Sequence, residues 1–240
     1  MKLSKNLFIT KFDVQKYACP ISKLDRLTYF DRYLFRPISH FFLPLIFNVF
    51  RLSPNKLSII SLISALISSI LFFNQMPYLG VFFLILWAII DCADGSLARI
   101  LFSKYKIKSN LGEFFDAYAG YFVASTIWLN IGNYLFIKND NINFLYIGIF
   151  SSFLAIYSRC SYLKLNLVLL KDKNLSEYED NSRQSRLYYI YENLEFGSAL
   201  PILILLSLII NKLSLILLCY LFLNILLFLW LQNYIISQKN

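Results

Sequence analysis

Long apolar segments constrain this sequence more than any other feature. A helix needs about 20 consecutive apolar residues (roughly 17 to 25) to cross the hydrocarbon core of a bilayer. Several such runs occur between Leu57 and Ile236. The chain is also 58% hydrophobic and only 15% charged, which is too apolar for an ordinary soluble domain of 240 residues. These features predict an all-α, polytopic membrane protein.

We predict six transmembrane helices preceded by an interfacial amphipathic helix. The six spans are expected at residues 57–74, 78–102, 111–136, 142–170, 194–211 and 213–235. The first follows Ser53-Pro54-Asn55, a cap-like residue with a proline in the first turn. Lys and Arg concentrate in the N-terminal tail and in the loops after spans two and four, so the positive-inside rule predicts cytoplasmic termini. We therefore expect a multi-pass protein of the cell membrane whose active site faces the cytoplasm.

The region before the first span divides into two parts. Residues 1–20 are polar and are expected to be loosely ordered. The stretch Lys23 to Arg51 mixes apolar positions with arginines, which is typical of a helix lying at the interface. Pro37 and Pro44 should break or kink it. We assign 1–56 to the tail and interfacial helix, and 57–236 to a six-helix catalytic domain.

The positions of the basic residues and of the cysteines argue against nucleic-acid binding and against a zinc site. The formal net charge is +9, but the basic residues lie in the tail and loops of a membrane protein, so anionic lipid headgroups explain them better than nucleic acid. The four cysteines are scattered and are interpreted as packing residues. The single histidine, His40, is interpreted as a structural residue of the interfacial helix.

Four carboxylates interrupt the apolar pattern at the cytoplasmic ends of spans two and three. Asp91 and Asp94 share a helix face, as do Glu113 and Asp116, because each pair is three residues apart. Carboxylates clustered in a low-dielectric site repel one another unless a positive partner is present. An all-oxygen site of this kind favours Mg²⁺ or Mn²⁺, and such ions would also hold a diphosphate for attack.

Two glycines and an arginine accompany the carboxylates. Gly95 and Gly112 remove side chains where a phosphate or nucleotide could lie against the backbone, and Arg99 could contact phosphate. In the alternative interpretation the carboxylates form ion pairs with Arg99, Lys104 and Lys106, and the glycines serve close helix packing.

At these residues the sequence resembles the CDP-alcohol phosphatidyltransferase family. The matching residues are Asp91-Cys-Ala-Asp94-Gly95-Ser-Leu-Ala98-Arg99 and Gly112-Glu-Phe-Phe-Asp116. The resemblance implies metal-dependent transfer of a substituted phosphate from a CDP-linked alcohol or lipid donor to an acceptor, with release of CMP, in phospholipid or surface-glycan synthesis. It also implies two divalent ions and a homodimer. By the same resemblance, the metal ligands would be Asp91, Asp94 and Asp116, and the donor-binding residues would be Asn55, Gly95, Ala98, Arg99 and Gly112.

The sequence departs from the family pattern at its last aspartate, where this chain has Gly120. A glycine side chain can neither bind metal nor take a proton. Glu113 lies on nearly the same face as Asp116, one turn nearer the cytoplasm, and could supply a ligand by reaching inward. We therefore assign the catalytic role to Asp116 and Glu113. An acceptor that is already ionised would need no general base, and a non-catalytic membrane subunit descended from the family is the alternative.

Two further arginines are candidates for binding an anionic acceptor. Arg159 interrupts an apolar span, where a charge is expensive unless it faces a polar cavity; snorkelling to the interface is its other explanation. Arg186 lies in a polar segment before span five that could be an acceptor pocket or a solvated loop. A small transporter would also place charges in the membrane, but the charged motif sits at helix ends and no inverted repeat is visible.

Overall fold

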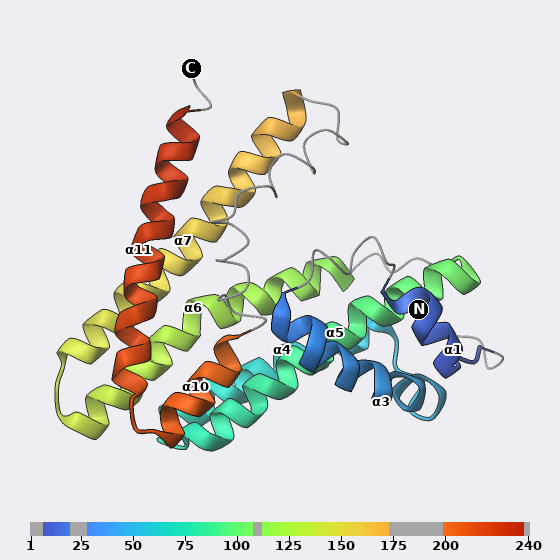
Figure 1. The fold of residues 1–240 in the computed structure, drawn as a ribbon, viewed down its shortest axis with the longest axis horizontal. Helices are drawn as coiled ribbons and strands as arrows, with labels where there is room; N and C mark the ends of the chain where they lie inside the picture. Colours follow the sequence, from blue (N-terminus) through green and yellow to red (C-terminus); the bar gives the residue numbers. More distant parts are fainter. Residues whose placement is uncertain (1–6, 20–27, 108–111, 173–198, 238–240) are drawn as a thin grey trace.

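The fold is entirely helical over the part of the chain that the structure describes. This computed structural model describes residues 7–19, 28–107, 112–172 and 199–237, with the backbone alone for 112–113, 116, 162–172 and 234–237. The elements are α1 (Lys11–Asp13), η1 (Val14–Ala18), η2 (Asp31–Phe35), α3 (Arg36–Asn48), α4 (Pro54–Phe73), α5 (Pro77–Tyr105), α6 (Gly112–Asn139), α7 (Asn143–Asp172), α10 (Leu200–Ile209) and α11 (Leu213–Ser237), of which η1 and η2 are π-helical turns (Figure 1). The predicted all-α class is confirmed.

Local sequence signals set the ends of the long helices. Ser53 caps α4, because its side chain accepts a hydrogen bond from the backbone N–H of Lys56 at 3.4 Å, and Pro54 occupies the first turn. Helix α5 ends where Lys106 adopts the left-handed conformation, with φ of 57°. The expected cap at Ser53, with Pro54 in the first turn of the helix, is therefore confirmed.

Within the described residues, four helices are long and apolar enough to cross a membrane. They are Pro54–Phe73, Pro77–Tyr105, Asn143–Ser161 and Leu213–Asn233. Helix α6 also lies at a predicted span but is not one of these four, and the ten residues of α10 extend only about 15 Å. The protein is thus an all-α polytopic membrane protein, and a count of six spans stays a prediction.

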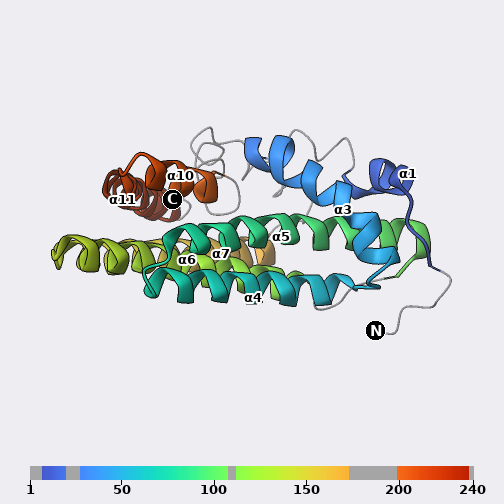
Figure 2. The ribbon, with the colours of Figure 1, turned by 90° about the horizontal axis from the view of Figure 1, so that it is seen from below.

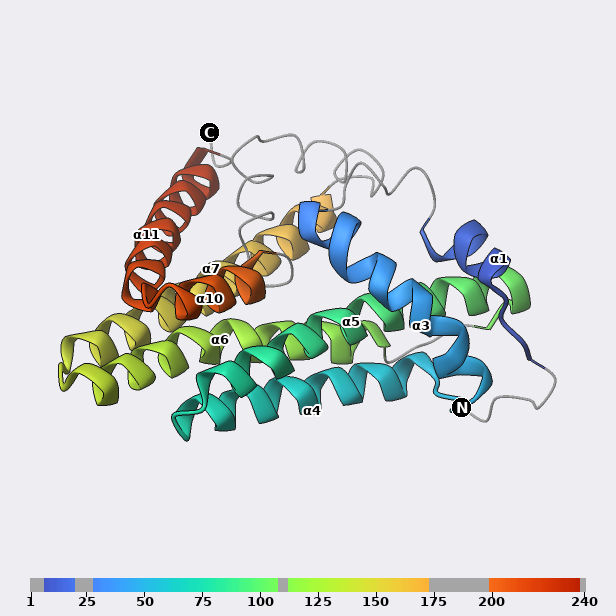
Figure 3. The ribbon, with the colours of Figure 1, turned by 60° about the horizontal axis from the view of Figure 1, so that its bottom comes forward.

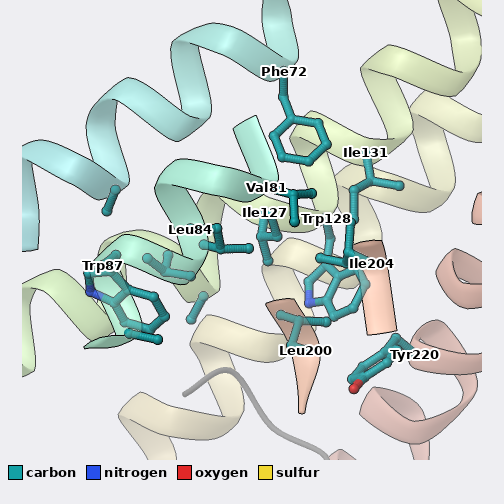
Figure 4. Close-up of a cluster of buried hydrophobic side chains, with 14 of the residues drawn as sticks. Phe72, Val81, Leu84, Trp87, Ile127, Trp128, Ile131, Leu200, Ile204 and Tyr220 are labelled. Carbon is teal, nitrogen blue, oxygen red and sulfur yellow. The ribbon is translucent and has the colours of Figure 1, made fainter. Parts of the chain in front are cut away.

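The helices α4, α5 and α6 run side by side, with α7 and α11 paired at an angle to them (Figures 1 and 3). Since α5 reverses the direction of α4 and α6 reverses it again, α4 and α6 run the same way. Their apolar faces meet α10 and α11 in one core, which Figure 4 shows around Trp87, Trp128 and Tyr220. The rings of Trp128 and Tyr220 lie 4.4 Å apart.

Two glycines allow α6 and α7 to cross at very short range. A Cβ on Gly148 would lie 2.6 Å from the carbonyl oxygen of Trp128, and one on Gly132 would lie 2.6 Å from that of Phe144. Both distances are below real contact distances, so the crossing requires residues without side chains.

The N-terminal region covers the C-terminal half of α5, where the carboxylate motif lies (Figure 2). Helix α3 crosses α5 and runs without a break through Pro44, while Pro37 lies in its first turn directly after the π-turn η2. The helix is therefore continuous at Pro44, where the sequence analysis expected a break or a kink. The expectation of a loosely ordered tail is wrong for residues 7–19, which fold into α1 and η1 and bury Ile9 and Ala18.

Candidate active site

Asp94 is the more buried of the two motif carboxylates on α5. It lies on α5 with 4% of its surface exposed, and Ser58 of α4, fully buried, donates a hydrogen bond to its Oδ2. Asp91 lies one turn earlier on the same face of α5 and is half-buried. A buried carboxylate is costly unless it is hydrogen-bonded or neutralised. The hydrogen bond from Ser58 therefore offsets part of the cost of burying Asp94.

The register of α4 and α6 sets the level of the Asp116 backbone along the bundle. Asn130 of α6 donates a hydrogen bond to Ser69 of α4 at 2.8 Å. Because the two helices run the same way with equal rise per residue, positions eleven residues earlier on each, Ser58 and Ala119, lie at one level. The backbone of Asp116 is thus within one turn of the level of the Ser58–Asp94 hydrogen bond.

The guanidinium of Arg99 is held close to Gly95. Its Nε donates to the backbone carbonyl of Ala18 at 2.6 Å, and its Nη2 donates to Ser96 Oγ at 3.2 Å. Its Nη1 lies 3.4 Å from where a Cβ on Gly95 would be. Lys104 pairs with Asp13 at 2.7 Å. These two basic residues of α5 therefore both bind the N-terminal segment.

Two ionisable groups from the N-terminal region approach the motif. His40 Nε2 lies 3.0 Å from Ser96 Oγ, and burial, with the nearby charges of Arg36 and Arg99, lowers the pKa of His40 to about 4. His40 is therefore neutral at pH 7. Asp31 of η2 contacts the Cys92 thiol at 4.0 Å, and burial raises the pKa of Asp31.

Gly120 and Arg159 are neighbours across the α6–α7 interface. A Cβ on Gly120 would lie 3.3 Å from Nη1 of Arg159. A guanidinium therefore lies directly beside the position where the family pattern has its last aspartate. Asp116 is one turn away from Gly120 on the same face of α6. The structure thus places Arg159, which the sequence analysis treated separately, beside Gly120.

The other predicted site residues differ in how far the structure describes them. Ala98 is half-buried on α5, and Asn55 is half-buried one turn before Ser58 on α4. Gly112 begins α6. The side chains of Glu113 and Asp116, and the whole of Arg186, lie outside the described residues.

The oxygen atoms of the carboxylate motif suit a hard divalent cation as ligands. Asp91 and Asp94 offer carboxylate oxygens, and the buried Ser58 hydroxyl holds one oxygen of Asp94 by a hydrogen bond. Among the side chains that the structure describes, no three His, Cys, Asp or Glu residues gather at one point. A further carboxylate ligand would come from a side chain outside that set, and Asp116 is the candidate given by the resemblance.

Comparison with known proteins decides the family. The family model described as CDP-alcohol phosphatidyltransferase matches residues 51–232, which covers α4 to α11 almost completely. The chain belongs to the CDP-alcohol phosphatidyltransferase family. Members transfer a phosphate group from a CDP-alcohol donor in lipid synthesis, release CMP and are generally dependent on divalent metal. No curated protein matches the chain.

Sequence analysis missed three contributors to this CDP-alcohol phosphatidyltransferase site. Ser58 and Ser96 look like ordinary packing serines in apolar helices, and Ala18 takes part only through its backbone carbonyl. The spacing Ser58-x-x-Ser61-x-x-Ser64 indicates a polar stripe on α4. It does not indicate which serine meets a carboxylate.

Proposed function

We propose that this protein is an active CDP-alcohol phosphotransferase. It moves a substituted phosphate from a CDP-linked alcohol or lipid donor to an anionic acceptor, in phospholipid or surface-glycan synthesis at the cytoplasmic face of the cell membrane. The observation that carries the proposal is the buried Asp94, held by a hydrogen bond from Ser58 within the signature that the family model covers. A carboxylate kept ready for a cation in an apolar bundle is typical of a functional site.

Asp91, Asp94 and Asp116 would hold Mg²⁺ or Mn²⁺, and Glu113 would add a ligand by reaching inward. When bound, two such ions would neutralise the charge of the diphosphate and stabilise the leaving CMP. Gly95 and Ala98 leave room along α5 for the donor's cytidine diphosphate, with Arg99 beside it. Asn55 and Gly112, at the starts of α4 and α6, would complete the donor site.

The pair Gly120 and Arg159 supports an acceptor that carries its own negative charge. A neutral hydroxyl needs a base to take its proton, and Gly120 offers none. An ionised oxygen attacks the β-phosphorus directly, and the bond from that phosphorus to the oxygen of CMP breaks. The guanidinium of Arg159, beside Gly120, would bind such an anion. Arg186 is a second candidate for the acceptor site.

A non-catalytic membrane subunit of the same descent is the second candidate, and Gly120 is the observation that favours it. Release of CMP from CDP-linked alcohols by the purified protein in lipid separates the two. We expect release from the wild-type protein and its loss in Asp94→Asn, with normal expression and folding. A subunit without activity would release no CMP with any acceptor, and Asp94→Asn would change only assembly.

The acceptor class is tested with the same assay. We expect phosphomonoesters to support CMP release and neutral alcohols of equal size to fail. Arg159→Ala should raise the KM for the acceptor while the KM for the donor stays unchanged. Equal activity with neutral acceptors would contradict the role given to Arg159. The homodimer implied by the family resemblance is tested by the mass of the protein in detergent.

A further inference from the structure

Residues 7–19 form an ordered segment, here called the N-terminal strap, that joins α3 to the C-terminal end of α5. Asn48 of α3 binds the strap through two hydrogen bonds with the backbone of Ile9, at 3.0 and 2.7 Å. On α5, Lys104 pairs with Asp13 at 2.7 Å, and the hydroxyl of Tyr105 donates to the carbonyl of Phe8 at 2.6 Å.

Apolar burial fixes the strap further. Ile9 and Ala18 are fully buried, in one cluster with Leu43 and Phe47 of α3 and Leu97 of α5. The strap is thus part of the packed structure, and the backbone of its last helical residue, Ala18, has a defined place against α5.

The end of the strap determines where the guanidinium of Arg99 lies. The carbonyl of Ala18 accepts from Nε, and Ser96 Oγ accepts from Nη2. With these two nitrogens bonded to the protein, Nη1 is the nitrogen next to Gly95, 3.4 Å from the position of a Cβ there. Two contacts on one rigid, planar group fix its orientation.

His40 completes the arrangement from α3. Ser96 is fully buried, and its Oγ accepts a hydrogen bond from Arg99, so its own hydrogen is left to donate to His40 Nε2 at 3.0 Å. A neutral imidazole accepts that hydrogen. The chain of hydrogen bonds therefore runs from Arg99 through Ser96 to His40.

We propose that His40 and Ser96 are positioning residues that, with the docked strap, hold Arg99 in the orientation that binds the diphosphate of the donor. This inference rests on the proposed function and adds three elements to it: the strap and α3, which lie outside the signature, and the buried Ser96 within it. Neither residue touches the donor. Each acts through the guanidinium, since loss of either contact allows the long Arg99 side chain to leave the surface at Gly95.

Equilibrium binding tests the inference without requiring turnover. The probe is cytidine diphosphate with Mg²⁺, titrated into the full-length protein in lipid nanodiscs. We expect Ser96→Ala and His40→Leu each to weaken binding about tenfold, because each removes a contact that orients a charged donor. His40→Gln should restore binding, since its side-chain amide can accept the same hydrogen bond. Ser39→Ala is the matched control, because Ser39 is fully buried beside His40 and its Oγ has no hydrogen-bond partner among the described residues.

Acceptor affinity and melting temperature distinguish loss of Arg99 positioning from general damage to the fold. The inference predicts that Ser96→Ala leaves both at the wild-type value while nucleotide binding falls. Wild-type nucleotide affinity in Ser96→Ala and His40→Leu would overturn it, as would an equal loss in Ser39→Ala. Failure of the wild-type protein to bind cytidine diphosphate would overturn the proposed function as well, so the two failures are distinguishable.

Discussion

Replacing Ser58 by alanine tests the role given to the buried carboxylate. The substitution removes one hydrogen bond to Asp94, at a site where Ser58 is fully buried and Asp94 is 4% exposed. A hydrogen bond to a charged group contributes about 1.5–3 kcal/mol, and each 1.4 kcal/mol is about tenfold in an equilibrium constant. Ser58→Ala should therefore weaken Mg²⁺ or Mn²⁺ binding roughly tenfold to a hundredfold, as is common for outer-shell partners of metal ligands.

The assay is the Mg²⁺ concentration that gives half-maximal CMP release, together with Mn²⁺ binding measured by electron paramagnetic resonance. Ser61→Ala is the control, because Ser61 is equally buried on α4 but donates to the carbonyl of Ser58 within its own helix. The reasoning would be refuted by a Ser58→Ala protein that folds normally and binds Mn²⁺ as tightly as the Ser61→Ala protein.

Three further predictions concern other parts of the molecule. Gly120→Asp should lower turnover with an anionic acceptor about tenfold, because its carboxylate would pair with Arg159. The uncharged control, Gly120→Asn, should have a smaller effect. A gain of activity in Gly120→Asp would contradict this prediction. Gly148→Ala should destabilise the protein by about 1–3 kcal/mol, seen as a lower Tm, since its Cβ would lie 2.6 Å from a backbone oxygen; an unchanged Tm would refute the close crossing. The pKa of His40 is about 6.5 in the unfolded chain and about 4 in the folded protein, so the unfolded state binds the proton more tightly. The contact of α3 with α5 should therefore be fully stable above pH 6.5 and should weaken as the pH falls from 6.5 toward 4. Hydrogen exchange of α3 amides should show this, and His40→Gln should abolish it.

Much of the fold follows from local sequence signals. The apolar runs place the helices, and Ser53 with Pro54 marks the start of α4 because a cap and a first-turn proline act within one turn. The shared face of Asp91 and Asp94 follows in the same way from helical spacing. These features depend on neighbours in the sequence, so they could be predicted without the fold.

The hydrogen bond from Ser58 to Asp94 could not be predicted, because it depends on the register between helices. Helix α4 buries Ser58, Ser61, Ser64 and Ser68, and in the sequence all four look alike, as small residues that pack between helices. Only the alignment of α4 with α5 determines which one reaches a carboxylate. The contact between Gly120 and Arg159 likewise depends on how α6 crosses α7.

The N-terminal strap was missed for a different reason. Its polar composition predicts a solvated tail, but Ile9 and Ala18 find an apolar surface that α3 and α5 form together. The buried surface therefore exists only after the helices have packed. The two hydrogen bonds between Asn48 and the backbone of Ile9 also leave no pattern in the sequence.

Release of CMP from a CDP-linked alcohol is the most direct test of the central claim. The purified protein in lipid is incubated with donor and a phosphomonoester acceptor, with Mg²⁺ or with a chelator. The account predicts CMP release with Mg²⁺ that stops on chelation and in the Asp94→Asn variant. CMP release that is equal in the presence of chelator, or in Asp94→Asn, would contradict it.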